Sequence, residues 1–402
     1  MQINIVNRIT DSVNLVTSKI QGRIERRRII SLNPPQNPIG NVLISYILTP
    51  FLLKPDEEMP LSHTHFWECL QMAKTFLDMG YCVDVIRFDN DVFIPQKKYD
   101  FFIETRWNLQ RSAPYLDRNC IKILHADAAH LIFHNAAEAN RLLQLQQRRG
   151  LTLTPRRFEM PNKAIEHADC AIVLGNEFTI STYKYANKPI YRVPISTPVL
   201  YPWFEDKDFS TCRRRFLWFG SGGLVHKGLD LLLDVFAQMP DYHLTICGPI
   251  SKEKDFEAAF EKELYQTPNI DTIGWVDISS KEFLKILNSC VAVIYPSCSE
   301  GGGGCVITCM HGGLIPIVSY ESSVDVNEDC GIVLPNCSLE EIKNAIRTLA
   351  DFPTQKLEVM ARNSREFVRE HHTQENFARV YSQTIEQIIK DRTPKEQLAS
   401  YV

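Results

Sequence analysis

A glycine-rich segment, Trp218–Gly228, carries residue types that are suited to binding a phosphate. It holds Gly220, Gly222 and Gly223, which let the backbone approach a ligand closely, and Lys227, which stands just before an expected helix. Backbone amides at a helix start, together with a lysine ammonium, form an anion site. The spacing matches neither a P-loop nor a dinucleotide fingerprint, because His226 precedes the lysine and Val225 stands where a third glycine is needed. A tight turn with a surface lysine is the alternative interpretation.

A second segment, Tyr295–Gly313, places Glu300 directly before four glycines and an expected helix start near Cys305. A carboxylate in this position can accept hydrogen bonds from sugar hydroxyls, and the glycine amides and the helix start can bind a phosphate. A flexible surface loop is the alternative, although four glycines cost backbone entropy that a purely structural connection rarely needs. The segment therefore offers groups for both a sugar and a phosphate.

The elements that must position these segments follow from the apolar pattern. From residue 40 onward, short apolar runs alternate with longer helical stretches without hairpin turns, which predicts parallel sheets with crossover helices. In the first half we expect strands at 42–47, 82–87, 101–104, 121–125, 170–174 and 190–193, and helices at 64–79 and 136–149. In the second half we expect strands at 215–219, 243–247, 272–275, 291–295 and 314–319, and helices at 228–238, 256–264, 281–288, 306–311, 339–350, 357–371 and 378–390.

The predicted fold class is α/β, with two Rossmann-like, doubly wound, parallel-sheet domains that face a cleft. A C-terminal helix could cross back to the first domain. The expected divisions are an N-terminal arm (1–39), a first domain (40–200), a polar linker (201–211), a second domain (212–375), and a C-terminal helix and tail (376–402).

Five motifs follow one another in the second half. They are Lys227-Gly228, Gly248-Pro249, Gly274-Trp275-Val276, the run from Pro296 to Gly301, and the run from Met310 to Pro316. In order and spacing they resemble the nucleotide-sugar half of the family 4 retaining glycosyltransferases, which have the two-domain GT-B architecture. The resemblance spans residues 213–390, whereas the first half is similar in architecture only.

Two positions depart from the pattern of that family. Gly222 stands where the family usually has an arginine, which removes one positive charge from the diphosphate site. Thr308 stands where the family has a second glutamate that holds the ribose, and a hydroxyl binds a ribose more weakly than a carboxylate does. These departures indicate a divergent member of the family.

The resemblance implies a set of functional residues. Lys227 and helix amides would stabilise the leaving diphosphate, and Glu300 would orient the donor sugar. The first half would present His125 or His130 to that sugar. The remaining donor-binding residues would be Ser221, Gly222, Gly223, Gly248, Trp275, Val276, Gly301, Gly302, Gly303, Gly304 and Thr308. The donor would be a nucleoside-diphosphate sugar, with UDP or GDP as the nucleotide, and no metal ion or separate cofactor would be required.

The implied activity is transfer of a hexose, with retention of configuration, to a glycan, a lipid or a small molecule, as in polysaccharide biosynthesis. A non-catalytic nucleotide-sugar-binding or scaffold protein, and a GT-B nucleotide-sugar epimerase, are the alternatives. A basic stretch formed by Arg148, Arg149, Arg156 and Arg157 could receive a phosphorylated or acidic acceptor, or could be a solvated loop.

Composition narrows the class of protein. The 402 residues carry 44 Lys and Arg against 48 Asp and Glu, for a net charge of −4, which argues against a nucleic-acid-binding protein. The twelve cysteines are scattered among apolar runs, as in a cytoplasmic protein with reduced thiols. Residues 1–28 combine an apolar stripe with a basic end, so a helix there could lie on a membrane surface or serve as a docking arm.

Overall fold

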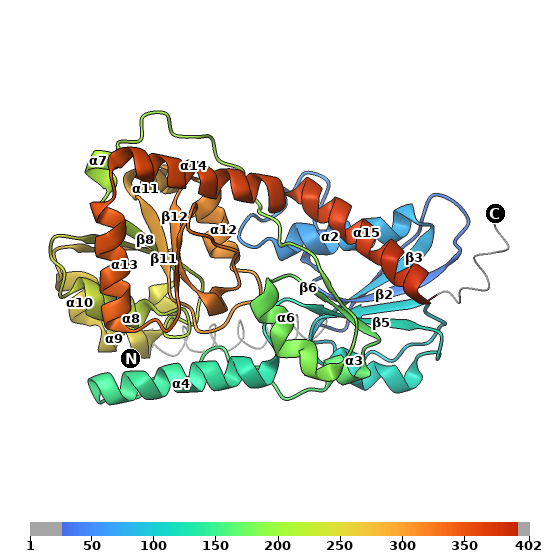
Figure 1. Ribbon diagram of the computed structural model, residues 1–402. Coiled ribbons are helices and arrows are strands. Elements are labelled where there is room, and N and C mark those ends of the chain that lie inside the picture. Colours follow the sequence, from blue (N-terminus) through green and yellow to red (C-terminus); the bar gives the residue numbers. More distant parts are fainter. Residues whose placement is uncertain (1–25, 393–402) are drawn as a thin grey trace, which may run out of the picture. The chain divides into compact units, whose positions relative to one another are not determined.

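The computed structural model describes residues 26–392, which form two β-sheets and the helices around them (Figure 1). The first sheet has the strand order β1-β3-β2-β4-β5-β6-β7 and the second has the order β10-β9-β8-β11-β12-β13. The predicted class of two doubly wound, mainly parallel α/β sheets is confirmed. The described residues divide into two compact units, the first with 26–59, 65–125 and 162–171 and the second with 60–64, 126–161 and 172–392. The boundaries predicted from the sequence stay a prediction.

The first sheet contains one strand that the sequence analysis did not anticipate. Its strands are β1 (Ile29–Leu32), β2 (Gly40–Tyr46), β3 (Tyr81–Arg87), β4 (Phe101–Glu104), β5 (Ile121–Ala126), β6 (Cys170–Val173) and β7 (Ile190–Arg192). β2 pairs in parallel with β3 and β4, and β4 pairs in parallel with β5. β1 pairs with β3 in the antiparallel sense. Residues 29–32, which the sequence placed in an N-terminal arm, therefore belong to the sheet. The membrane-binding helix expected at 1–28 falls almost entirely outside the described residues.

The core of the first unit forms where α2 (His65–Asp78) packs on the sheet. Phe76 is completely buried, and its ring centroid lies 5.2 Å from that of Phe101 on β4. Tyr81 of β3 meets the same Phe101 ring edge-on at 5.4 Å. Residues 42–46 of the apolar strand predicted at 42–47 are buried, as expected for a central strand of a parallel sheet. The other helices that follow these strands are α3 (Asn108–Ser112), α4 (Leu131–Arg149), α5 (Ala164–His167) and α6 (Glu177–Tyr183).

All the pairings in the second sheet are parallel. Its strands are β8 (Arg215–Phe219), β9 (His243–Cys247), β10 (Ile270–Gly274), β11 (Ala292–Tyr295), β12 (Ile315–Ser319) and β13 (Ile332–Leu334). Its helices are α7 (Phe209–Cys212), α8 (Leu229–Phe236), α9 (Lys254–Ala259), α10 (Glu261–Gln266), α11 (Lys281–Ser289), α12 (Gly304–His311), α13 (Leu339–Asp351), α14 (Thr354–His371) and α15 (Gln374–Arg392). The helix expected at 256–264 is divided into α9 and α10, and α7 begins inside the predicted linker.

Helix α4 belongs to the second unit, where it lies beside α8 (Figure 1). Arg148 forms an ion pair with Asp230 at 2.7 Å and a second one with Asp234, both on α8. Arg149 pairs with Asp234 as well and with Glu263 at 2.8 Å. These arginines of the predicted basic stretch therefore attach α4 to the second sheet, so their charges are already neutralised by carboxylates.

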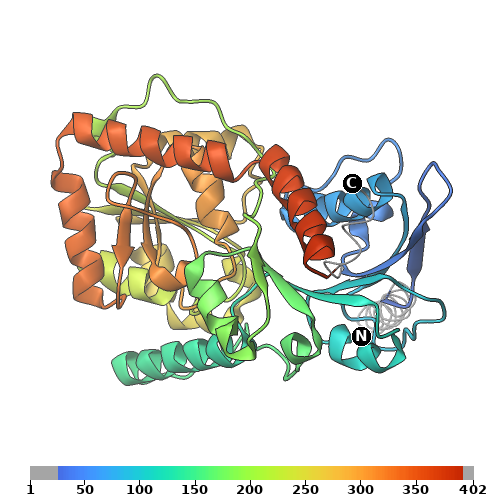
Figure 2. The same ribbon diagram turned by 45° about the vertical axis from the view of Figure 1, so that its right-hand side comes forward.

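The last two helices follow one another with a change of direction between them (Figures 1 and 2). Near the end of α15, Asp391 accepts a hydrogen bond of 2.6 Å from the hydroxyl of Tyr191 on β7. The C-terminal helix therefore reaches a strand of the first sheet, as the predicted crossing implied. In residues 26–392, no helix combines the length and the apolar character that a membrane span requires.

Candidate functional site

Lys227 and Glu300 meet because the strands that precede them are neighbours. Lys227 follows β8 and Glu300 follows β11, and these two strands pair in parallel although they are far apart in the sequence. The strand order reverses at this pair, since β9 and β10 lie to one side and β12 and β13 to the other. Ligands of open α/β sheets bind outside the carboxyl ends of the strands at such a switch point. Here the Lys227 ammonium lies 2.6 Å from a Glu300 carboxylate oxygen.

The lysine and the glutamate belong to a cluster of four side chains. Glu300 Oε1 accepts hydrogen bonds from Lys227 Nζ, from the Tyr295 hydroxyl at 2.9 Å and from the Ser297 hydroxyl at 2.9 Å. Lys227 Nζ also donates to the Tyr295 oxygen at 2.8 Å. Lys227 is only 3% exposed, whereas the Glu300 side chain is 14% exposed. Within residues 26–392, Glu300 Oε2 has no hydrogen-bond partner, so one oxygen is held by the protein and the other is available.

The charges in this cluster are fixed by their surroundings. Burial raises the pKa of Glu300, but the positive charge of Lys227, assisted by that of Arg157, outweighs burial and lowers the pKa to about 2. Burial and the nearby Glu300 charge raise the pKa of Tyr295 well above its usual value. At neutral pH, Glu300 is therefore an anion and Tyr295 is a neutral hydrogen-bond donor.

Two buried histidines support the loop that carries Glu300. His226 Nε2 lies 2.6 Å from the Ser299 carbonyl oxygen and must donate to it, because a carbonyl only accepts. His134 of α4 likewise donates from Nε2 to the Arg157 carbonyl at 2.8 Å and contacts the Ser299 hydroxyl through Nδ1 at 3.0 Å. The two rings lie 4.7 Å apart. Burial lowers the pKa of His226 to about 3 and also lowers the pKa of His134, so both are neutral at pH 7.

The neutral state of His226 predicts a pH-dependent stability. The pKa of His226 lies near 3 in the folded protein and at 6.5 in the unfolded chain, so acid below pH 6.5 protonates the unfolded chain first and favours unfolding. We expect the free energy of unfolding of the wild type, relative to His226→Gln, to fall between pH 6.5 and pH 3 by up to about 1.4 kcal/mol per pH unit. Urea unfolding of both proteins from pH 8 to pH 5 measures this difference. His167→Gln, at an exposed histidine, is the control, and a His226 difference that is constant across this range would contradict the neutral assignment.

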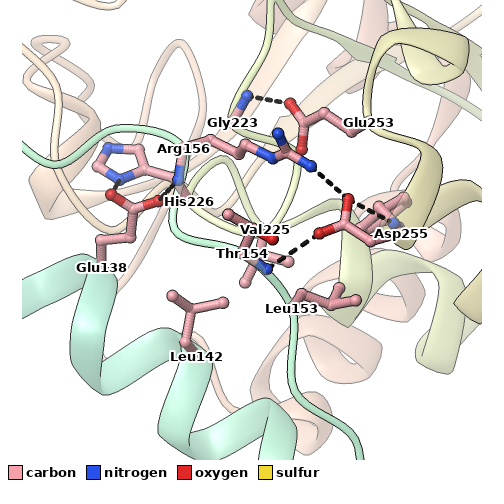
Figure 3. A pocket seen from close by; sticks show the side chains of 11 residues that line it. Glu138, Leu142, Leu153, Thr154, Arg156, Gly223, Val225, His226, Glu253 and Asp255 are labelled. Atoms are coloured by element: carbon pink, nitrogen blue, oxygen red, sulfur yellow. Dashed lines mark hydrogen bonds and ion pairs between the residues drawn. The ribbon is translucent and has the colours of Figure 1, made fainter.

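The first glycine-rich loop is stabilised by an internal carboxylate. Glu253 Oε1 accepts a hydrogen bond from the Gly223 amide at 2.5 Å (Figure 3). Its Oε2 accepts one from the Leu224 amide at 3.3 Å. Glu253 is buried. The Gly223 amide, which we expected to bind a phosphate, is therefore occupied by a carboxylate of the chain itself. The small cavity beside it, between α4 and this loop, holds about 10 Å³, room for a single water molecule and not for a nucleotide.

The second glycine run is fixed by close backbone contacts. A side chain at Gly301 would place its Cβ atom 2.1 Å from the Asp127 carbonyl oxygen, so only glycine fits against the segment after β5. Gly303 adopts a φ of 58° and is the N-cap of α12, whose first turn begins at Gly304. Burial raises the pKa of the Cys305 thiol in the same turn, and the nearby Ser221 backbone opposes that rise. The two glycine-rich segments therefore lie against each other at the start of α12.

The other predicted donor-binding residues differ in how far they are exposed to solvent. Gly248 is buried and packs so closely on the Gly220 carbonyl that a Cβ atom would lie 2.6 Å from it. Trp275 is 67% exposed, whereas Val276 beside it is buried. The Thr308 hydroxyl is buried and donates to the Gly304 carbonyl at 2.8 Å, so it can serve a ribose only as an acceptor.

The two histidines expected from the first half have different surroundings. His125 lies on β5 in the first unit and is completely buried, with its ring 5.5 Å from that of Tyr46. His130 lies in the second unit, where its Nδ1 caps α4 by accepting from the Ile132 amide and its Nε2 contacts the Tyr185 hydroxyl at 3.0 Å. A contact of either histidine with the donor sugar stays a prediction.

Sequence reasoning missed several residues of this site. Tyr295 and Ser297 stand inside the second motif, so their place after β11 was a signal that could have found them. Glu253 and His134 carried no such signal, because their contacts with the glycine-rich loops depend on packing between segments that are distant in the sequence.

Part of the chain matches a known protein family. Residues 214–367, less than half of the chain, match the family model described as glycosyl transferases group 1. A search of curated protein sequences found no match.

Solved structures match over most of the chain. Sucrose-phosphate synthase from Thermosynechococcus elongatus superposes with a TM-score of 0.59 at 17% identity, covering 89% of this chain and 100% of its own. HepE from Anabaena, solved in complex with UDP-glucose, superposes with a TM-score of 0.55 at 13% identity, covering 87% of this chain and 100% of its own. At these identities the likeness establishes the fold. The chain accordingly has the two-sheet α/β fold of these structures, and residues 214–367 within it are similar to the group 1 glycosyl transferases.

Proposed function

We propose that the protein transfers a sugar from a nucleoside-diphosphate sugar to an acceptor hydroxyl with retention of the anomeric configuration. The observation that carries this proposal is the buried Lys227–Glu300 pair at the switch point of the second sheet, next to the first turn of α12. An ammonium and a carboxylate side by side at this site can bind two different parts of a nucleotide sugar. The lysine suits the diphosphate, and the carboxylate suits the sugar hydroxyls.

Lys227 has the role of stabilising the leaving group. Negative charge grows on the diphosphate as the bond to the sugar breaks, and a fixed ammonium in a largely buried site is worth more there than in water. The first-turn amides of α12, at Gly304 and Cys305, add the positive end of a helix dipole. Because Lys227 is held by Glu300 and Tyr295, it needs little reorganisation when the charge develops.

Glu300 has the role of orienting the donor sugar. Its Oε1 is held by Lys227, Tyr295 and Ser297, which fixes the plane of the carboxylate. Its Oε2 is then free to accept hydrogen bonds from sugar hydroxyls. Because the pKa of Glu300 lies near 2, the group stays an acceptor at every pH at which the protein would be assayed.

The proposed donor is a UDP- or GDP-sugar, most simply a hexose. The structure of HepE with UDP-glucose supports a uracil nucleotide. A glycan, a lipid or a small molecule is the proposed acceptor. Lys227 and the α12 amides supply positive charge to the diphosphate, so we assign no step to a metal ion.

A non-catalytic nucleotide-sugar-binding protein is the second candidate. Two observations favour it. The Gly223 amide already donates to Glu253, and the Thr308 hydroxyl already donates to a carbonyl of its own helix. The two candidates differ in one respect only: both bind the donor, but only the enzyme breaks the bond between sugar and diphosphate.

The test is donor turnover followed by NMR. The protein is incubated with UDP- and GDP-linked hexoses in a chelator, with simple glycosides and alcohols as acceptors. We expect release of one nucleoside diphosphate at an unchanged rate in the chelator, and a first-formed product with the anomeric configuration of the donor. An inverted product would contradict retention, activity lost on chelation would contradict the metal-free assignment, and binding without turnover would favour the second candidate.

A further inference from the structure

We propose that Arg157, on the segment between α4 and α5, is a second cationic residue of the donor site and binds the diphosphate. This inference rests on the proposed function, and it adds a residue outside the group 1 domain. From the sequence, Arg157 belongs only to a basic stretch that could receive a phosphorylated or acidic acceptor or be a solvated loop. Four observations separate Arg157 from the other arginines of that stretch.

The first observation is its position. The Arg157 side chain lies across the first glycine-rich loop, so that a Cβ atom built on Gly223 would lie 2.6 Å from Arg157 Cγ and 2.9 Å from Cδ. Any side chain at residue 223 would therefore displace Arg157. The loop is the one that leads to Lys227, and the absence of a side chain at Gly223 provides room for the guanidinium stem.

The second observation is that two buried side chains clamp the backbone of Arg157. Glu138 of α4 accepts the Arg157 amide with both carboxylate oxygens, at 3.0 Å and 2.9 Å. His134 of α4 donates to the Arg157 carbonyl at 2.8 Å. Figure 3 shows Glu138 directed from α4 toward His226 and the Arg156 amide. Arg157 is thus presented by a rigid support, which is a property of residues that must be preorganised for a ligand.

The third observation is that the Arg157 guanidinium has no partner. Within residues 26–392 it forms no ion pair or hydrogen bond, and its Nε atom is inaccessible to water. The neighbouring Arg156 pairs with Asp255, as Figure 3 shows, and Arg148 and Arg149 pair with carboxylates of the second unit. A guanidinium N–H that is shielded from water and unbonded is costly, so an acceptor that is absent from the chain itself would be expected to complete it.

The fourth observation is where the charge acts. The positive charge of Arg157 helps to lower the pKa of Glu300. Burial lowers the pKa of His63, and the charges of Arg157 and Lys227 both lower it further. Arg157 and Lys227 therefore direct positive potential into one region. Two cations of different shape suit a diphosphate, because the guanidinium fork can bind two oxygens of one phosphate while the ammonium acts as a point charge. The ligand class is a nucleoside diphosphate, free or as a sugar ester.

The experiment compares Arg157→Ala with Arg156→Ala, which removes the adjacent but ion-paired arginine. Calorimetric titrations measure the affinity of each full-length protein for UDP, GDP and ADP, and for the matching nucleosides. For the nucleotide that binds the wild type, we expect Arg157→Ala to weaken the diphosphate about 10–100-fold and to leave nucleoside affinity unchanged. Arg156→Ala should bind like the wild type. Arg157→Lys should recover part of the loss, since it restores charge without the fork.

The melting temperature without ligand separates binding from folding. Because the Arg157 guanidinium forms no ion pair or hydrogen bond within the described residues and acts on Glu300 only through its charge, Arg157→Ala should melt close to the temperature of the wild type. Diphosphate affinity that is unchanged in Arg157→Ala, in a wild type that binds the nucleotide, would overturn this inference alone. A marked loss of melting temperature without ligand would do the same, by giving Arg157 a structural role. A wild type that binds no nucleoside diphosphate would overturn this inference and the proposed function together.

Discussion

Replacing Lys227 with methionine is expected to lower the turnover number about 10²–10³-fold. Methionine keeps most of the apolar stem of a side chain that is only 3% exposed, and it removes the ammonium that would face the leaving diphosphate. The same change leaves the Glu300 carboxylate with two neutral donors, Tyr295 and Ser297, so the melting temperature should fall as well. Steady-state kinetics with the best donor and thermal unfolding measure the two effects separately.

A matched control shows whether the loss belongs to the site. Lys252→Ala removes an exposed lysine from the same unit, and it should leave turnover and melting temperature unchanged. The double variant Lys227→Met/Glu300→Gln removes both charges of the pair, so it should melt closer to the wild type than Lys227→Met does while remaining inactive. Turnover near the wild-type value in folded Lys227→Met would exclude the assigned role of the lysine.

Replacing Glu300 with glutamine should also cost about 10²-fold or more in turnover. The amide keeps the shape of the side chain and can accept from Tyr295 and Ser297, but it leaves the Lys227 ammonium without a counter-charge. In place of the carboxylate oxygen Oε2, the amide presents either an NH₂ group or a neutral, weaker acceptor to the sugar hydroxyls. If Glu300 orients the sugar, the affinity for the nucleoside diphosphate alone should be maintained or increased, since the freed ammonium no longer competes.

Asp234→Asn is the control for neutralising a paired carboxylate in the same unit. Asp234 is buried and pairs with Arg148 and Arg149, so its loss should lower stability without lowering turnover per folded molecule. Equal loss of turnover in Asp234→Asn and Glu300→Gln would mean that stability, not sugar recognition, explains the effect.

Most of the fold follows from patterns that are local in the sequence. The strands at 101–104, 215–219 and 243–247 have the predicted bounds, because apolar runs flanked by polar turns have only one way to be buried in a parallel sheet. The short strands β1 and β13 were missed, since Ile29–Leu32 and Ile332–Leu334 are too brief to show a period. The break between α9 and α10 falls at Phe260, whose ring lies 4.4 Å from the guanidinium of Arg149 on α4, a tertiary contact that the local sequence does not reveal.

The candidate site could be predicted only in part, for a related reason. Lys227 and Glu300 each follow an apolar strand, so their place at the carboxyl edge of a sheet could be inferred. The pairing of β8 with β11 brings them together, and no single sequence motif predicts which strands pair. Arg157 could not be found, because its sequence neighbours Arg148, Arg149 and Arg156 look alike, and only their carboxylate partners in the fold distinguish them.

The most direct test of the central claim is a thermal-shift screen of the full-length protein with UDP, GDP and ADP and their hexose esters, without added metal. Wild type and Lys227→Met are compared, because a ligand that binds only the folded state raises the melting temperature in proportion to the logarithm of its concentration over its dissociation constant. We expect that one nucleoside diphosphate stabilises the wild type, that its nucleoside does so much less, and that Lys227→Met loses the difference. A wild type that no nucleotide stabilises, or a shift that Lys227→Met retains in full, would contradict a diphosphate site at Lys227 and Glu300.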